Sequence, residues 1–292
     1  MVDINTYLKN QKLSVDEHLA RLLAEEQDRN KHLEKLYGAM SYTVLLPGKR
    51  LRPIMAIATQ EIFSRSTEEV INSACAIEMV HVASLMLDDL PMMDDAEYRR
   101  GEKTNHLMFG QAVTVLASAA LWTKVFSILA KIRAVPVNDL VTHTAKSIGD
   151  TGLVRGQFFD VESFAKTQTV EELKESYALK TGTLFALATY MGATLGGASE
   201  RERLILEKFG MMFGIAFQIR DDIMDTEQTV EQSGKDRGAD SKNKKPNMVS
   251  IAGKSEAKAM IFEMVDEMCA SLEEIEGDCE VLKALTKQLM VK

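Results

Sequence analysis

Apolar residues recur at helical spacing over most of this 292-residue chain, and no segment shows the alternation of period two that marks strands. The first such pattern covers residues 14–46 and predicts one amphipathic helix or two. It begins at Ser14 with Glu17 three residues later, a spacing typical of a capping box. Pro47 and Gly48 end it.

The same reasoning predicts helices along the rest of the chain. The region 111–133 is almost entirely apolar and predicts a central buried helix. Residues 227–247 are rich in polar residues and predict a mobile loop. The other expected elements are a helix starting near Ile54 after Pro53, one from Thr67 to Leu87 that Pro91 breaks, a turn at 135–139, and helices over 139–166, 169–197 and 200–226. Together they indicate an all-α fold with one domain over residues 1–292.

Composition narrows the class of protein. The net charge of −8 argues against generic nucleic-acid binding. Cys75, Cys269 and Cys279 are too few and scattered for a disulfide framework or a thiolate metal site, which favours a reducing compartment such as the cytoplasm. No signal peptide is visible at the amino terminus, and no apolar run reaches the roughly 18 residues of a membrane span. An organelle location with a removed targeting segment stays open.

Two aspartate clusters have the spacing of metal sites. One contains Asp88, Asp89 and Asp94, and the other contains Asp221, Asp222 and Asp225. Asp221 and Asp225 lie about 40° apart on a helix, so they share a face. Asp88 and Asp94 converge only if Pro91 ends the helix and turns the chain back. Carboxylates in apolar surroundings need a cation, and Mg²⁺ prefers oxygen ligands. The alternative for each cluster is a solvated helix end.

Basic residues accompany both clusters. The segment Gly48–Pro53 contains Lys49, Arg50 and Arg52, and Arg99 and Arg100 closely follow the first cluster. Further basic positions are Lys180, beside Thr181, and Lys235 and Lys245 after the second cluster. Each alone could be an ordinary surface charge. Their order around the aspartates indicates a protein that holds a polyanion through metals and direct ion pairs.

The chain resembles the trans-isoprenyl diphosphate synthases, the family of farnesyl and geranylgeranyl diphosphate synthases. The resemblance extends over nearly the whole chain. The motifs that carry it, in order, are Gly48–Pro53, Glu78-Met-Val-His81 with Ser84 leading to Asp88-Asp89, Arg99-Arg100-Gly101, Thr104-Asn105-His106, Gly156-Gln157 with Asp160, Lys180-Thr181-Gly182, Phe217-Gln218 with Asp221, Asp222 and Asp225, and Gly234-Lys235 leading to Lys245.

This resemblance implies an isoprenoid-synthase bundle of about ten or more helices around a deep central cavity, generally as a homodimer. It implies that Asp88, Asp94 and Asp221, supported by Asp89, Asp222 and Asp225, hold three Mg²⁺ ions on an allylic diphosphate. The expected allylic substrates are dimethylallyl, geranyl and farnesyl diphosphates. Direct contacts to the diphosphate are implied for Arg99, Lys180, Thr181, Gln218, Lys235 and Lys245, and contacts to isopentenyl diphosphate for Lys49, Arg52, His81 and Arg100. For His81 a satisfied core histidine is the alternative.

Product length is expected to depend on the floor of the cavity. Family members of this type that make farnesyl diphosphate carry an aromatic residue at the position of Ala83. Ala83 and Ser84 are small, which favours a product of twenty carbons, geranylgeranyl diphosphate, with farnesyl diphosphate or a longer product as alternatives. Trp122 and Phe126 are candidates for the next floor, and plain core packing is the alternative for each.

The chain departs from the family pattern at three places: Asn247-Met248-Val249 replaces a common Thr-Tyr-Pro, Ala117-Ser118-Ala119 replaces a common Gly-Asp pair, and Pro47 stands where a glycine is usual. None of these removes an expected ligand. Two functions of other classes are considered. A terpene cyclase would not need the second diphosphate site, and a non-catalytic subunit of a heteromeric synthase typically lacks one aspartate motif.

Overall fold

The computed structural model describes residues 3–27, 33–64, 66–162, 169–227 and 246–290. Within them the fold is a bundle of helices, as predicted. Its elements are α1 (Ile4–Gln27), α2 (Glu34–Leu45), α3 (Leu51–Phe63), α4 (Glu68–Asp88), β1 (Tyr98–Arg99), β2 (Glu102–Lys103), α5 (Asn105–Phe109), α6 (Gln111–Leu129), α7 (Val137–Ile148), α8 (Leu153–Glu162), α9 (Val170–Tyr177), the π-helix η2 (Ala178–Gly182), α10 (Thr183–Gly196), α11 (Glu200–Glu227), α13 (Met248–Ala252), α14 (Lys254–Leu272) and α15 (Glu280–Lys287).

Helices α4 and α10 form the centre of the bundle because both are apolar on nearly every face. Thr67 caps α4, since its side chain accepts a hydrogen bond from the backbone N–H of Val70. Helix α10 contributes to both hydrophobic clusters of the protein: Leu187 packs in the first, with α4 and α6, and Phe185 packs in the second, with α11 and α14. The two clusters therefore meet along α10.

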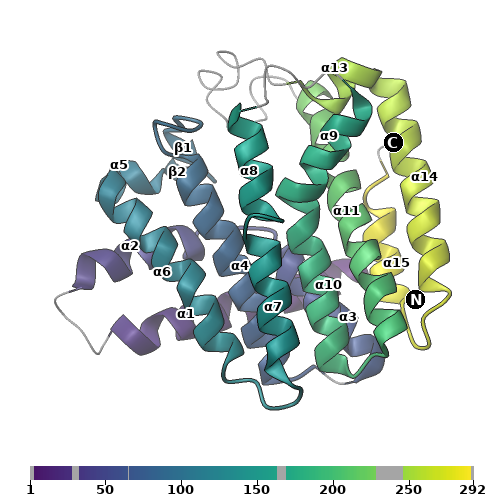
Figure 1. Cartoon of the computed structure of the whole chain (residues 1–292), viewed down its shortest axis with the longest axis horizontal. Helices are drawn as coiled ribbons and strands as arrows, with labels where there is room; N and C mark the ends of the chain where they lie inside the picture. The colour runs from purple at the N-terminus through teal and green to yellow at the C-terminus, as the bar shows by residue number, and fades with distance from the viewer. Residues whose placement is uncertain (1–2, 28–32, 65, 163–168, 228–245, 291–292) are drawn as a thin grey trace.

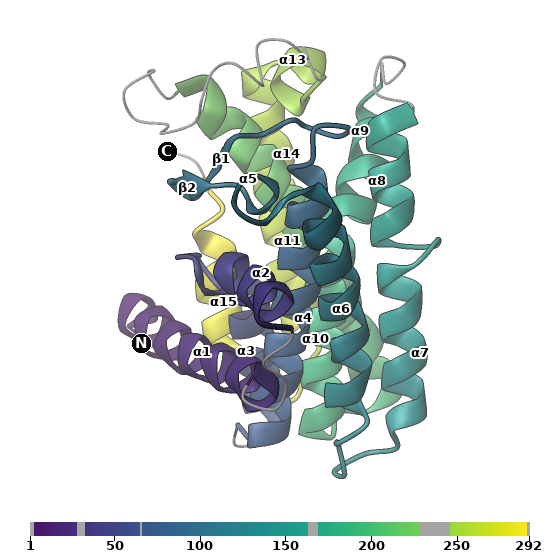
Figure 2. The same ribbon diagram turned by 90° about the vertical axis from the view of Figure 1, so that its left-hand side faces the viewer.

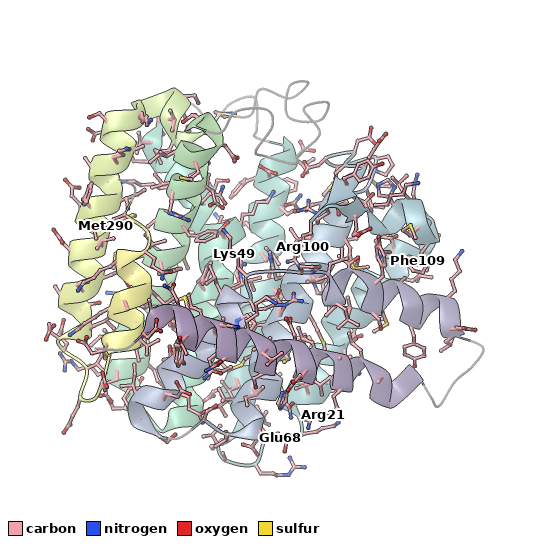
Figure 3. The ribbon with its side chains drawn as sticks, turned by 180° about the vertical axis from the view of Figure 1, so that it is seen from behind. Arg21, Lys49, Glu68, Arg100, Phe109 and Met290 are labelled. Carbon is pink, nitrogen blue, oxygen red and sulfur yellow. The ribbon has the colours of Figure 1, made fainter. Side chains whose placement is uncertain are left out.

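The remaining helices surround these two (Figures 1 and 2). Helices α2, α5 and α6 lie on the left of the bundle, α7 and α8 lie in the middle at the front, and α14 and α15 lie on the right (Figure 1). Helix α1 runs across the back of the bundle rather than along it (Figure 3). It is tied to the core by Val15 and Leu19, both fully buried.

Several predicted boundaries are wrong. Helix α1 begins at Ile4, so Ser14 lies inside a helix, where its carbonyl oxygen lies 2.8 Å from Nδ1 of His18. Helix α3 begins at Leu51 rather than near Ile54, because a proline is tolerated in the first turn of a helix. The helix predicted over 139–166 is two helices, α7 and α8, separated at Gly149–Gly152.

Other boundaries are confirmed. Helix α2 ends at Leu45, before Pro47, and α4 begins after Thr67. The segment 169–197 is helical throughout as α9, η2 and α10, and 200–226 corresponds to α11. A two-residue antiparallel ladder, β1 with β2, is present although strands were not expected. Most of the predicted loop 227–247 lies outside the described residues.

Helix α6 differs from the prediction of a central buried helix. Its face with Thr114, Ala117 and Leu121 is buried, but Val115 and Leu116 are exposed, Leu116 to 61%. By length and composition α4 and α6 are both apolar enough to cross a membrane, although neither is an uninterrupted apolar run, since Glu78 lies in α4 and Lys124 in α6. Helix α4 is mostly buried inside the bundle, which is also typical of the core helix of a globular protein.

Candidate active site

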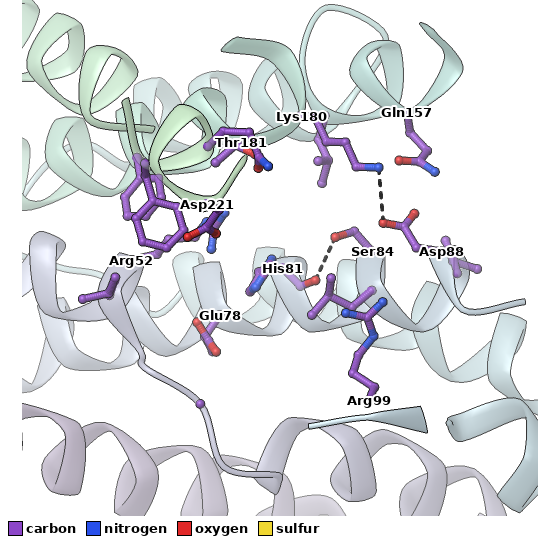
Figure 4. Close-up of a pocket in the computed structure, with 18 of the residues that line it drawn as sticks. Arg52, Glu78, His81, Ser84, Asp88, Arg99, Gln157, Lys180, Thr181 and Asp221 are labelled. Atoms are coloured by element: carbon purple, nitrogen blue, oxygen red, sulfur yellow. Dashed lines mark hydrogen bonds and ion pairs between the residues drawn. The ribbon is translucent and has the colours of Figure 1, made fainter. Parts of the chain in front are cut away.

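A cavity of about 1050 Å³ lies between α3, α4, α8, η2, α10 and α11. Residues of both aspartate clusters and of the basic motifs line it, as seen in part in Figure 4. Its polar lining contains Lys49, Arg50, Arg52, Glu78, His81, Ser84, Asp88, Arg99, Arg100, Gln157, Glu162, Lys180, Thr181, Gln218 and Asp221. Its apolar lining includes Leu85, Trp122, Leu153, Val154, Phe158, Val161, Phe185 and Phe217.

The turn after α4 brings the first cluster together, as predicted from Pro91. Helix α4 ends at Asp88, and the backbone N–H of Asp94 then donates to the carbonyl oxygen of Asp88 at 2.9 Å. Only 6% of Asp88 is exposed. Burial raises the pKa of Asp88 to about 6, against the attraction of Lys180, and the nearby charge of Asp94 raises it further. This carboxylate therefore lies where an added cation would be favourable.

Lys180 lies opposite Asp88 on the π-helix η2. Its Nζ atom is 3.8 Å from Oδ2 of Asp88 and 2.7 Å from Oδ2 of Asp160 on α8 (Figure 4 shows Lys180 and Asp88). Gly156 allows α8 to approach η2 this closely, because a Cβ atom there would lie 2.7 Å from the backbone nitrogen of Lys180. A π-turn is frequently found at functional sites. Here it places Lys180 and Thr181 in the wall of one cavity.

Asp89 is paired with Arg99 in this structure, and its role in the metal site stays a prediction. Its side chain is 1% exposed and accepts from Nε of Arg99 at 2.7 and 2.9 Å, with Nη2 of Arg99 at 2.6 Å. Burial raises the pKa of Asp89, and the Arg99 guanidinium opposes that effect. The pair fixes Arg99 at the cavity wall.

The second cluster lies on one continuous helix, α11, as predicted. Asp221 lines the cavity, while Asp225 is exposed one turn further on. Asp222 is buried and accepts hydrogen bonds from the hydroxyl of Tyr177 and, at 2.8 Å, from the backbone N–H of Met248. Asp222 therefore joins α9, α11 and α13, and its support of the metal site stays a prediction.

Gln218 lies one turn before Asp222 on the same helix and faces η2. Its Oε1 atom accepts a hydrogen bond of 3.1 Å from the hydroxyl of Thr181. Both side chains line the cavity, as predicted for two residues of a diphosphate site. Lys235 and Lys245 lie outside the described residues.

Lys49, Arg52, His81 and Arg100 line the same cavity. The Lys49 ammonium lies 5.5 Å from the ring centre of Phe217, and the Arg52 guanidinium lies 4.5 Å from that of Phe185. The Nε atom of Arg52 is buried and has no hydrogen-bond partner among the described residues. Burial lowers the pKa of Arg52 to about 10. A pocket with this many cations favours an anionic ligand.

His81 is neutral in this setting. Burial lowers its pKa well below the usual range, and the charges of Arg52 and Arg100 lower it further. It can therefore donate or accept a hydrogen bond without adding charge. His81 lines the cavity (Figure 4), as a donor to a diphosphate would, and its role there stays a prediction.

The β1–β2 hairpin carries Arg99 and Arg100. Arg100 and Gly101 form its turn with φ of 55° and 85°, the positive values that a tight two-residue hairpin requires. Arg99 reaches Asp89, whereas Arg100 donates to the carbonyl oxygen of Leu46 at 3.3 Å. The turn thus directs two adjacent cations to different partners.

Sequence reasoning assigned no role to three features of the site. Glu78 is buried in the cavity wall and pairs with Arg50, and Asp160 pairs with Lys180. Both acids belong to motifs that carry the family resemblance, so those motifs could have identified them. Helix α8 also supplies apolar wall residues, of which Phe158 is 59% exposed. The apolar periodicity of α8 does not distinguish these wall residues from surface residues.

Only some of the residues expected to set product length lie in the cavity wall. Ser84 and Trp122 line the cavity, and the indole N–H of Trp122 donates to the carbonyl oxygen of Val80 at 3.2 Å. Ala83, by contrast, is fully buried in the first hydrophobic cluster. Adjacent residues of a helix point about 100° apart, so only Ser84 of this pair lines the cavity, and the influence of the small Ala83 on product length stays a prediction.

Within the described residues, no three acidic, histidine or cysteine side chains already form a metal-binding group. The donor set nevertheless fits Mg²⁺. Asp88 and Asp221 are carboxylates in the wall of one cavity, and burial raises the pKa of Asp88, so a bound cation would stabilise its charged form. Mg²⁺ typically binds through one or two carboxylates together with substrate phosphates, so a preformed cage is not required.

Comparisons with known proteins agree with this geometry. The Polyprenyl synthetase family profile matches residues 33–285. The chain is 37% identical to a farnesyl diphosphate synthase of Geobacillus stearothermophilus over 90% of both chains, and 33% identical to a dimethylallyltranstransferase of Fischerella ambigua over 99% of this chain and 87% of that one. A geranylgeranyl pyrophosphate synthetase of the archaeon Geoglobus acetivorans superposes with a TM-score of 0.85 at 27% identity, covering 99% of each chain.

Proposed function

Because the chain belongs to the polyprenyl synthetase family and is a trans-prenyltransferase, we propose that it condenses allylic diphosphates with isopentenyl diphosphate to make geranylgeranyl diphosphate. The observation that carries the proposal is that both aspartate clusters and the basic motif Gly48–Pro53 contribute to one cavity. Such a cavity can hold two diphosphates, one beside the aspartates and one beside the arginines. Residues 1–292 act as one catalytic unit in this proposal.

The allylic diphosphate lies between the aspartate clusters. Asp88, Asp94 and Asp221 would hold three Mg²⁺ ions, which when bound stabilise the negative charge that develops on the leaving diphosphate. Lys180 and Arg99 add direct charge, and Thr181 and Gln218 add hydrogen bonds. Asp89 and Asp222 support the site by holding Arg99 and the α9–α11 contact, and Asp225 lies beside it on α11.

Isopentenyl diphosphate lies against Lys49, Arg52, His81 and Arg100. The unpartnered Nε of Arg52 and the neutral imidazole of His81 are donors that a phosphate oxygen can satisfy. This second cation group distinguishes the proposal from a terpene cyclase, which binds one diphosphate. Both intact aspartate clusters distinguish it from a non-catalytic subunit.

The chemistry then follows from charge and water exclusion. The allylic C–O bond breaks, the electron pair leaves with the diphosphate, and an allylic cation remains in the apolar part of the cavity. The walls formed by Trp122, Leu153 and Phe185 exclude water that would quench it. The double bond of isopentenyl diphosphate attacks the cation, and a proton is lost to the departing diphosphate. No basic side chain is required for that step.

Product length is the finer part of the proposal. The small Ser84 in the wall supports a twenty-carbon product, and Trp122 is the candidate floor. Relatives with both names exist: a geranylgeranyl diphosphate synthase of Pseudescherichia vulneris is 38% identical over 68% of this chain, beside the farnesyl diphosphate synthase already described. Farnesyl diphosphate is therefore the second candidate.

Incubating the purified protein with Mg²⁺, isopentenyl diphosphate and each of the dimethylallyl, geranyl and farnesyl diphosphates tests this function. Mass analysis should find geranylgeranyl diphosphate from every starter. Farnesyl diphosphate as the end product would replace the length assignment only. A cyclic hydrocarbon would indicate a cyclase, and no turnover without a second protein would indicate a subunit.

We further propose a homodimer formed through α6. Its exposed stripe includes Ala112, Val115, Leu116 and Ala119, spaced so that all lie on one face. Leu116→Glu should convert the dimer to monomer in light scattering. A wild-type monomer would contradict the proposal.

A cytoplasmic location is likewise proposed, supported by three cysteines that are all unpaired. Fractionation of cells that express the full chain tests it. Recovery of the protein with an organelle or membrane fraction would overturn it.

A further inference from the structure

Glu78 is a buried acid in the wall of a cavity that has been proposed to bind anions. Only 2% of it is exposed, and it lies one turn before His81 on α4. Its Oε1 atom accepts a hydrogen bond of 2.8 Å from Nη1 of Arg50 and lies 3.8 Å from Nη2 of Arg100. Its charge also acts on Arg52. A carboxylate at this position repels a bound diphosphate, which points to a different role for Glu78.

The contacts of Arg50 indicate that role. It lies at the start of α3 with φ of 52°, a left-handed conformation that is uncommon for a residue other than glycine. Its guanidinium bonds Asp16 on α1 at 2.8 Å, Glu78, and the carbonyl oxygens of Val44 and Leu46 at 2.8 and 2.9 Å. Its donors are thus directed to the protein. Arg50 anchors the backbone between Lys49 and Arg52 instead of binding ligand.

Arg100 is held at the same place. It shares the Leu46 carbonyl oxygen with Arg50 and lies against Gly48, where a Cβ atom would be 2.9 Å from its Nη1. Glu78 is therefore the acid that both arginines approach, from α3 on one side and from the hairpin on the other. Figure 3 shows Lys49 and Arg100 on the same side of the molecule, and Figure 4 places Glu78 beside Arg52 and His81.

We infer that Glu78 is a positioning residue of the isopentenyl diphosphate site, which it orders by holding Arg50 and Arg100 so that Lys49, Arg52 and Arg100 face one ligand. The inference rests on the proposed function, since it names the ligand of that site. Glu78 itself does not contact the ligand. The negative charge of Glu78 reduces the repulsion between the arginines while the site is empty. The gain in binding free energy from this ordering exceeds the loss from repulsion between Glu78 and the diphosphate.

Glu78→Gln tests this, because it keeps the shape and removes the charge. Binding of isopentenyl diphosphate without Mg²⁺ is measured by calorimetry, and steady-state KM values are measured for both substrates. We expect the dissociation constant and KM for isopentenyl diphosphate to rise about tenfold or more, and the KM for the allylic diphosphate to stay within about twofold. Glu207→Gln, which removes an acid paired with His143 outside this cavity, is the matched control and should change neither.

Each other outcome has a definite meaning. Unchanged or tighter binding of isopentenyl diphosphate overturns the inference, because Glu78 would then only oppose the ligand. Equal increases in both KM values overturn it as well, since they indicate general disorder. Where the Gln variant does not fold, Asp16→Asn removes the other acid on Arg50 and should weaken isopentenyl diphosphate binding in the same selective way; no change would overturn the inference. If the wild-type protein binds no isopentenyl diphosphate, it is the proposed function that fails.

Discussion

The ammonium group of Lys180 lies 2.7 Å from Oδ2 of Asp160. The two residues come from η2 and α8, which Gly156 allows to approach closely. Because Lys180 is also 3.8 Å from Asp88, its ammonium group contacts both a residue of the first aspartate cluster and an acid on α8. When Asp88 binds Mg²⁺, Asp160 can still hold the ammonium at the position where the diphosphate lies.

The first prediction is that Asp160→Asn lowers kcat about tenfold or more. The loss of a charged partner leaves Lys180 free to move, and a tenfold change corresponds to about 1.4 kcal/mol of transition-state stabilisation. Steady-state kinetics with saturating substrates measure it. Glu175→Gln, on a surface pair with Arg155, is the control and should be neutral. An Asp160→Asn variant with wild-type kcat would show that Lys180 does not need this acid.

The sequence predicted the helical class and the turn at Pro91 because each has a local signal, whereas the roles of the site residues came from the resemblance to a family. Proline punctuation and carboxylate spacing are such signals. The break of 139–166 was missed although Gly149-Asp150-Thr151-Gly152 is a typical turn sequence, and the start of α1 at Ile4 was missed because Ser14 and Glu17 imitate a cap. Several residues near a helix end can act as its cap, and tertiary packing decides which of them does so.

The remaining differences concern partners that only the fold brings together. Six aspartates look equivalent in sequence, yet Asp89 is paired with Arg99 and Asp222 is bonded by Tyr177. These partners are 10 and 45 residues away along the chain. Likewise Ala83 and Ser84 are adjacent, but only the structure shows which of them faces the cavity.

A second prediction separates two adjacent aspartates. Asp221→Asn should lower kcat by orders of magnitude with little change in the melting temperature, because Asp221 lines the cavity. Asp222→Asn should lower the free energy of unfolding by about 1–3 kcal/mol, because a buried acceptor of two hydrogen bonds is altered. Kinetics and thermal unfolding of both variants measure this.

Tyr177→Phe provides the matched control for Asp222. It removes the hydroxyl donor without touching either aspartate, and it should destabilise the protein in the same range as Asp222→Asn. The reverse pattern, with Asp221→Asn unstable and Asp222→Asn inactive but stable, would exchange the two roles.

The third prediction concerns pH. The pKa of Asp88 is about 6, so the carboxylate is protonated below that pH, and a protonated group does not bind a divalent cation. The apparent Mg²⁺ affinity, measured by titration in the presence of a substrate analogue, should be nearly constant above about pH 7. Below about pH 6 it should fall by as much as tenfold per pH unit. An affinity independent of pH between 5 and 7 would remove Asp88 as a ligand.

The raised pKa of Asp88 has opposite effects on Mg²⁺ binding and on folding. Acid weakens Mg²⁺ binding, whereas it favours the folded state of the metal-free protein. The folded pKa of Asp88 lies above the value of 3.8 for an unperturbed aspartate, so the folded state holds this proton more tightly. Its contribution to stability is complete below about pH 3.8 and is lost as the pH rises towards 6. In metal-free protein, Asp88→Asn should remove this part of the pH dependence in denaturant titrations.

The fourth prediction tests the cavity wall. Ser84→Phe should shorten the product to fifteen carbons or fewer, because the ring would fill part of the cavity that Ser84 and Trp122 line. Ala83→Phe is the informative comparison. Ala83 is fully buried among packed helices, so the larger ring should destabilise the protein by about 1–3 kcal/mol while the product distribution of the folded fraction changes less. Mass analysis of products and thermal unfolding separate the two effects. Shortening by Ala83→Phe but not by Ser84→Phe would place the length-determining wall on the face of α4 that carries Ala83.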